Sequence, residues 1–232
     1  MKIIFCKTAW MKEYKGDVIN DPPQYGGKNQ DKWECNNFKC VDGKYYGFVE
    51  PQHADGEFRN KINIKKIGLS EKINNDKLVD GVLVVWIAKK EKNNLQIVGW
   101  YKNATVYSCT RPRDKNLKIV LDEKYAKGSK VSEEYNGMKD LGTDYRKKGN
   151  GVNIVADIEN CCLLDYRKER NFKQWRYDTY FKTYGHTIWY GKEDEEYLQN
   201  LNRLLKKIDD YSNSSNMEKY IDGDYNWLVG EK

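Results

Sequence analysis

Histidine is scarce in this sequence, and the cysteines are not spaced as metal ligands. The chain has 232 residues, and only His53 and His186 are histidines. None of the six cysteines forms a CxxC pair, and the adjacent Cys161 and Cys162 would strain a mutual disulfide. Zinc sites need clustered cysteines and histidines. We therefore expect no metal, no cofactor and reduced thiols.

Long apolar runs are also missing. The most apolar stretch, residues 81–90, is shorter than the roughly 20 residues that a membrane-spanning helix requires. The apolar patch near the N-terminus is too short for a signal peptide. We expect a soluble, cytoplasmic protein with no membrane partner.

The familiar catalytic motifs are absent. The sequence has no G-x-S-x-G elbow, no H-E-x-x-H pair, no glycine-rich phosphate loop and no dinucleotide fingerprint. Acidic pairs such as Glu133 and Glu134 lie in polar stretches, and no cysteine is placed in an obvious dyad with a histidine. We expect that this chain by itself is not a catalyst. A catalytic nuclease or base-processing enzyme remains an alternative.

Aromatic and basic residues are abundant. Aromatics make up 13% of the chain, with 18 Tyr and 7 Trp, and the net charge is 41 − 35 = +6. Flat rings stack on bases and cations contact phosphates, so this composition favours nucleic-acid binding. The positive charge is nevertheless smaller than that of a dedicated DNA-binding domain.

The hydrophobic pattern predicts an α+β fold, a small and strongly curved mixed sheet or β-barrel flanked by helices. A helix is predicted where Leu198, Leu201, Leu204, Leu205 and Ile208 recur at three-to-four spacing. Residues 1–211 should form one domain, with 111–150 as an insertion or mobile loop and 212–232 as a linker and tail. Residues 12–34 form a long polar loop, and such loops are often functional. Strands are expected at 2–8, 44–51, 61–68, 81–90, 97–107, 152–156 and 186–191.

Residues 166–184 interleave basic and aromatic side chains, which predicts phosphate contacts. A solvated loop whose rings fold into the core explains the pattern equally well. The candidate phosphate-binding residues are Lys102, Arg167, Lys168, Arg170, Lys173, Arg176 and Lys182.

The stretch IVGWYKNATVY, residues 97–107, has apolar ends and a polar, aromatic middle. We interpret the middle as a strand that leaves the core at the mouth of a barrel, where rings and amides could enclose an extruded base. For each residue taken alone, packing in the core or at its rim is the alternative. The candidate base-binding residues are Trp10, Asn36, Asn37, Trp100, Tyr101, Asn103, Trp189 and Tyr190.

Several stretches, among them KIIFCKTAWM, IVGWYKNATVY, NCCLLDYRKERNF and GHTIWY, resemble a bacterial domain found at the N-terminus of some HNH-type endonucleases. The order of strands also resembles the PUA-like superfamily, particularly its EVE and YTH branches. The resemblance extends over residues 1 to about 210. The chain departs from the EVE pattern in its 111–150 insertion and in its opening CKTAW, where EVE domains have Lys-Ser-Glu-Pro.

The resemblance implies a small β-barrel whose aromatic cage recognises a modified base in DNA. It implies Trp10 as one wall, Trp100 or Trp189 as another, and Asn36 or Asn37 as the contact to the base edge. The candidate bases are 5-methylcytosine, 5-hydroxymethylcytosine and N6-methyladenine. The partner would be double-stranded DNA, and the chain would direct a nuclease domain or subunit in a modification-dependent restriction or defence system. A module that binds a protein or a nucleotide is a further alternative.

Overall fold

The computed structural model describes residues 2–24, 32–51, 61–67, 78–91, 94–112, 151–181, 187–191 and 194–213. These residues form an α+β structure with one α-helix and eight strands in one mixed sheet. The strands are β1 (Ile3–Thr8), β2 (Cys40–Val41), β3 (Lys44–Gly47), β4 (Leu78–Glu91), β5 (Asn94–Pro112), β6 (Gly151–Asp157), β7 (Cys161–Leu163) and β8 (Ile188–Trp189).

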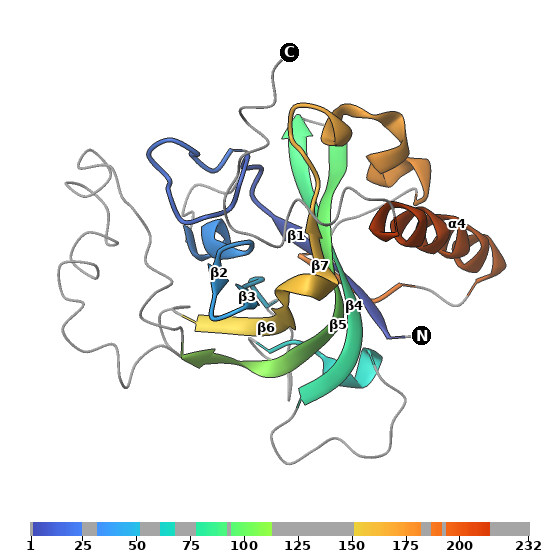
Figure 1. Cartoon of the computed structure of the whole chain (residues 1–232). Helices are drawn as coiled ribbons and strands as arrows, with labels where there is room; N and C mark the ends of the chain where they lie inside the picture. The colour runs from blue at the N-terminus through green and yellow to red at the C-terminus, as the bar shows by residue number, and fades with distance from the viewer. Residues whose placement is uncertain are drawn as a thin grey trace, which may run out of the picture.

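The sheet is open rather than closed into a barrel. Its strand order is β2-β3-β6-β5-β4-β1-β8, and β7 pairs with β5 outside this path. Among the described strands, β1 and β4 pair in parallel and the other pairs are antiparallel. Figure 1 shows the long β4–β5 hairpin at the centre of the molecule. The expected α+β class and mixed sheet are confirmed, but the sheet is large rather than small, it does not close into a β-barrel, and the described residues contain one α-helix rather than several.

Two bulges in the β4–β5 hairpin explain the polar middle of residues 97–107. Val82 pairs with Ala104 and Val84 pairs with Tyr101, so one residue of β4 faces the two residues Lys102 and Asn103 of β5. Asn103 has φ +51°, a left-handed conformation that asparagine tolerates better than most residues. A second shift lies beside Gly81, which has φ +72°. The polar residues therefore mark a bend in the strand.

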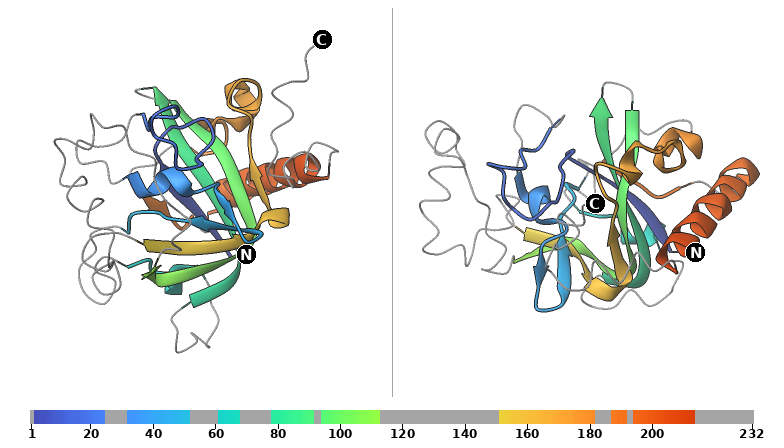
Figure 2. Two further views of the ribbon diagram at one scale, coloured as in Figure 1. Left: turned by 60° about the vertical axis from the view of Figure 1, so that its left-hand side comes forward. Right: turned by 45° about the horizontal axis from the view of Figure 1, so that its top comes forward.

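The central strands bury side chains on both faces, as their apolar sequences predict. On β4, Trp86 belongs to one core cluster, and Val85 and Ile87 belong to another. The helix α4 (Glu195–Ser212) and the turns after β7 cover the face of the second cluster. The N-terminal loop and the β2–β3 hairpin lie on the opposite side (Figures 1 and 2).

The predicted helix is confirmed, with one change in its buried stripe. Asp194 caps α4 by accepting a hydrogen bond from the Tyr197 N–H at 2.8 Å. Tyr197, Leu201 and Leu204 are buried, whereas Leu198 is exposed. The stripe therefore begins one residue earlier than the leucine spacing suggests. No helix among the described residues is long and apolar enough to cross a membrane.

Two further predictions about elements need correction. Residues 61–67 form no strand: Ile64–Lys66 is a 3-10 turn, and the alternating Ile62 and Ile64 are both buried. The expected 111–150 insertion overlaps the end of β5, which continues to Pro112. The rest of that insertion and most of the expected 212–232 tail lie outside the described residues.

Candidate functional site

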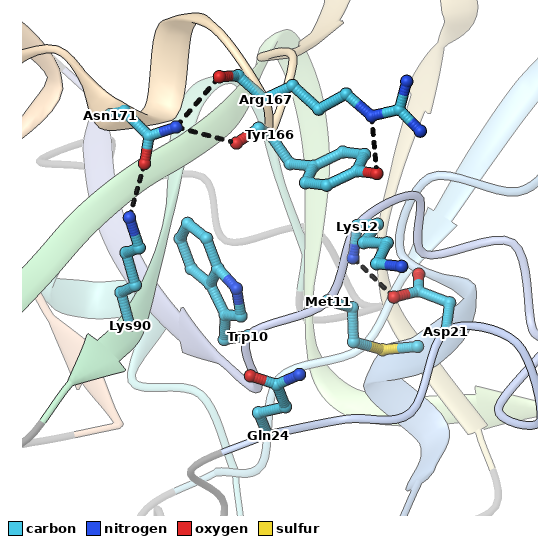
Figure 3. A pocket seen from close by; sticks show the side chains of 9 residues that line it. All are labelled: Trp10, Met11, Lys12, Asp21, Gln24, Lys90, Tyr166, Arg167 and Asn171. Atoms are coloured by element: carbon cyan, nitrogen blue, oxygen red, sulfur yellow. Dashed lines mark hydrogen bonds between the residues drawn. The ribbon is translucent and has the colours of Figure 1, made fainter.

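A pocket of about 390 Å³ opens near the tip of the β4–β5 hairpin, within the size range of small-ligand sites. Figure 3 shows side chains from three separate parts of the chain around it. The lining consists of Trp10, Met11, Lys12, Asp21, Gln24, Lys90, Tyr166, Arg167 and Asn171.

The first wall is the loop that follows β1. The backbone of Trp10 pairs with that of Gln24, with N···O distances of 3.1 and 2.9 Å. Asp21 closes the loop, because its carboxylate accepts the N–H groups of Lys12 at 2.6 Å and Glu13 at 2.7 Å. Asp21 also accepts the N–H of Tyr14, whose φ is +55°. The wall is thus held by hydrogen bonds within a polar loop.

The second wall is the turn that follows β7. Asp165 accepts the Arg167 N–H at 2.7 Å, and Asn171 donates to the carbonyls of Tyr166 and Arg167 at 3.3 and 3.0 Å. The Asn171 amide oxygen also accepts a hydrogen bond from Lys90 Nζ, which joins this turn to the end of β4. Figure 3 shows this contact beside the Trp10 ring. The turn is therefore anchored to the sheet.

Arg170 joins the two walls from behind. Its side chain is completely buried. Its guanidinium donates to Leu164 O at 2.6 Å on one side, and to Met11 O at 2.5 Å and Lys12 O at 2.7 Å on the other. It also lies 5.6 Å from the ring centre of Trp10. A planar fork of donors suits this geometry better than an ammonium group would.

The pocket presents two aromatic rings with cations beside them. Lys90 Nζ lies 5.9 Å from the Trp10 ring centre. Lys12 Nζ and the Arg167 guanidinium lie 5.5 and 5.3 Å from the Tyr166 ring centre. These separations are those of cation–π contacts. Trp10 is 8% exposed and packs in the core, whereas Tyr166 is partly exposed, so the pocket offers aromatic surface mainly from Tyr166, with positive charge beside it.

The charge balance of the lining favours an anion. Lys12, Lys90 and Arg167 supply three positive charges, and Asp21 supplies the one negative charge. Both Asp21 oxygens already accept backbone N–H groups. Gln24 adds an amide that could pair with a polar edge, whereas the Asn171 amide is already bonded to Lys90 and to two carbonyls.

A carboxyl group near the first wall should make stability depend on pH. Burial raises the pKa of Glu34 from 4.5 to about 7, although hydrogen bonds from the Ala9 N–H, at 2.7 Å, and from Thr8 oppose this increase. The folded protein therefore binds more protons than the unfolded chain within this range. We expect the free energy of unfolding to fall as the pH rises from about 4.5 to about 7.

Chemical denaturation of the wild type and Glu34→Gln across this pH range measures the effect. Glu34→Gln should flatten the decline, because the substituted amide does not titrate in this range. An equally steep decline in Glu34→Gln would contradict the assignment.

No protein-family model, curated protein or solved structure matches this chain. The assignment of the pocket therefore depends on its own geometry.

The structure places Trp100 and Tyr101 in the core, so their expected position at an open rim is wrong. Trp100 is 1% exposed and lies 5.4 Å from Trp175 and 5.6 Å from Tyr211, measured between ring centres. Tyr101 is buried on the opposite face of β5, near Trp86. The two rings therefore do not converge on one ligand, and neither lines the pocket.

The three candidate asparagines do not meet at a base edge either. Asn37 is buried and uses both ends of its amide on Phe48, donating to its carbonyl at 3.1 Å and accepting its N–H at 2.8 Å. Asn36 is also buried. Asn103 is exposed at the bulge. These positions indicate structural roles for Asn37 and Asn103.

Trp189 and Tyr190 lie away from the pocket. Trp189 packs against Phe5 and Tyr197, with ring centres 5.2 and 5.3 Å apart. The Tyr190 hydroxyl accepts the Asn63 N–H at 2.9 Å. Of the base-binding candidates, Trp10 alone lines the described pocket.

The candidate phosphate-binding residues separate into two groups. Lys102 pairs with Asp209 of α4 at 2.8 Å, Arg176 pairs with Asp178, and Arg170 is buried. Arg167, Lys168 and Lys173 are exposed, and Arg167 lines the pocket. Lys182 lies outside the described residues.

The sequence interpretation missed most of the lining as site residues, although it included two relevant signals. The long polar loop at 12–34 supplies Lys12, Asp21 and Gln24, and the interleaved stretch at 166–184 supplies Tyr166 and Asn171. Nothing in the sequence around Lys90 predicts a role in a site, because this lysine simply ends an apolar strand.

Proposed function

We propose that this chain binds nucleic acid and receives one base, extruded from its strand, in the pocket lined by Trp10 and Tyr166. The observation that supports this proposal is the combination of two rings and three cations around about 390 Å³. Rings accept a base by stacking, and cations neutralise the adjoining phosphates. The amide of Gln24 is suited to the polar edge of the base.

The resemblance to PUA-like readers extends this proposal to a modified base in double-stranded DNA. The features that agree with it are the opening strand, the polar loop with Trp10 after it, and the β4–β5 hairpin. The proposed ligand contains 5-methylcytosine, 5-hydroxymethylcytosine or N6-methyladenine, and a nuclease domain or subunit is the proposed partner. A titration against duplexes with each modification, beside the unmodified duplex, tests this part. Equal affinity for all four would reject the modified-base reader.

Tyr166→Ala should weaken nucleic-acid binding by about 1–3 kcal/mol, because one stacking ring is lost. Fluorescence anisotropy with a labelled oligonucleotide measures the change. The matched control is Tyr107→Ala: Tyr107 also lies beside an arginine, with the Arg111 guanidinium 4.9 Å from its ring centre, but outside the pocket. Equal affinities for the wild type and Tyr166→Ala would contradict the assignment of this pocket.

Salt dependence separates this proposal from a protein-binding module. The logarithm of the association constant should fall linearly with the logarithm of the salt concentration, because phosphate contacts release counterions. Lys90→Gln and Arg167→Gln should each make the slope shallower. A slope near zero would exclude phosphate contacts as a source of the affinity.

A further inference from the structure

Phe172 is the most exposed large hydrophobic side chain among the described residues. It is 52% exposed and directly follows Asn171, which lines the pocket. A single exposed hydrophobic residue needs no functional explanation. Whether Phe172 has a function depends on how rigidly its backbone is fixed and on which residues lie near it.

The backbone holds Phe172 in a fixed place. Its N–H donates to Glu169 O at 3.0 Å, and its carbonyl accepts the Trp175 N–H at 3.0 Å. On one side Asn171 is bonded to Lys90, and on the other Trp175 is fully buried. The exposed ring is therefore mounted on an anchored turn, and a ligand that stacks on it would not have to order a loop first.

Two lysines lie close to Phe172 in the sequence. Lys168 and Lys173 are exposed, and neither side chain forms an ion pair with another described residue. Glu169 is the one acidic residue between Lys168 and Lys173. Its carboxylate accepts hydrogen bonds from the Tyr211 hydroxyl at 2.7 Å and from the Asp165 N–H at 2.6 Å. An exposed ring on a segment with two exposed lysines suits a base together with its phosphates.

We infer that Lys168, Phe172 and Lys173, the flanking surface, bind the nucleotide next to the one in the pocket. This inference rests on the proposed function and specifies that the bound strand has two successive unpaired nucleotides, so a duplex ligand would have to open at the neighbouring base pair as well. One base enters the pocket and its neighbour stacks on Phe172. Lys168 and Lys173 contact the phosphates on either side of this neighbour.

Binding of a mononucleotide and of a short single-stranded oligonucleotide to the full chain tests this inference. Phe172→Ala should bind the oligonucleotide about 5- to 150-fold more weakly, the effect of one stacked base, and should bind deoxycytidine monophosphate as the wild type does. Phe172→Tyr should restore oligonucleotide binding because it keeps the ring. Leu198→Ala is the matched control, since Leu198 is 46% exposed on α4. Thermal denaturation of each variant confirms that it is folded.

The outcomes distinguish the inference from the proposed function. If Phe172→Ala binds the oligonucleotide as tightly as the wild type, the flanking surface is rejected and the pocket stands. If Phe172→Ala weakens mononucleotide binding equally, Phe172 acts through the pocket and the inference is also rejected. If the wild type binds neither ligand, the proposed function fails and the inference fails with it.

Discussion

Arg170→Met should lower the free energy of unfolding by about 3 kcal/mol or more, because it removes a buried guanidinium that donates to three backbone carbonyls. The three carbonyls that Arg170 bonds, those of Leu164, Met11 and Lys12, would lose their donor inside the protein. Each buried acceptor left without a partner costs about 1–3 kcal/mol. Chemical denaturation followed by tryptophan fluorescence measures the loss.

Two further variants assign the cause of this loss. Arg170→Lys keeps the positive charge but cannot make the same forked contacts, so it should recover only part of the stability. Arg176→Met removes an arginine six residues away that pairs with Asp178 at the surface, and it should cost less than about 1 kcal/mol. If Arg170→Met and Arg176→Met were equally stable, Arg170 would not join the two walls as we describe.

The effect on binding follows from the position of Arg170 behind the pocket. Arg170 spans 159 residues of sequence to reach Met11, and its contacts set the spacing of the two walls. Nucleic-acid affinity should therefore fall even in Arg170→Lys at a temperature where this variant remains folded. Arg170 would act as a positioning residue rather than as the phosphate contact that the sequence predicted.

The sequence predicted those elements whose signal is local. The apolar run at 81–90, the following hairpin and the leucine stripe of α4 each depend on residues within one segment, and all three form. The pocket depends on contacts between segments far apart in the sequence, such as Arg170 and Met11, which are 159 residues apart. Periodicity within either segment contains no information about such a contact. Consequently, the composition of residues 12–34 and 166–184 marked both segments as candidates, but it did not predict that they line one pocket.

Trp100 shows how a local irregularity misled the interpretation. Its neighbours Lys102 and Asn103 are polar because the strand bulges there, with Asn103 at φ +51°. In an uninterrupted strand, the same residues would place one face of the strand in solvent at this point. The bulge that prevents this is not recognisable from the sequence. The structure instead buries Trp100 against Trp175 and Tyr211.

Trp100→Ala should therefore destabilise the fold by about 3–5 kcal/mol, the typical cost of removing a buried tryptophan side chain. The cavity would open beneath α4, whose last turn contributes Tyr211 to the same cluster. Denaturation with urea measures the loss. The exposed Phe172→Ala is the control for removal of an aromatic ring, and it should change stability by less than about 0.5 kcal/mol.

The conservative variant Trp100→Phe separates packing from recognition. It should keep most of the stability, because a smaller ring still fills much of the site. Since Trp100 lies outside the pocket lining, folded Trp100→Phe should bind an oligonucleotide with wild-type affinity. Loss of binding in this variant at unchanged stability would return Trp100 to the base-binding residues. Loss of stability at unchanged affinity would establish that its ring belongs to the core and takes no part in recognition.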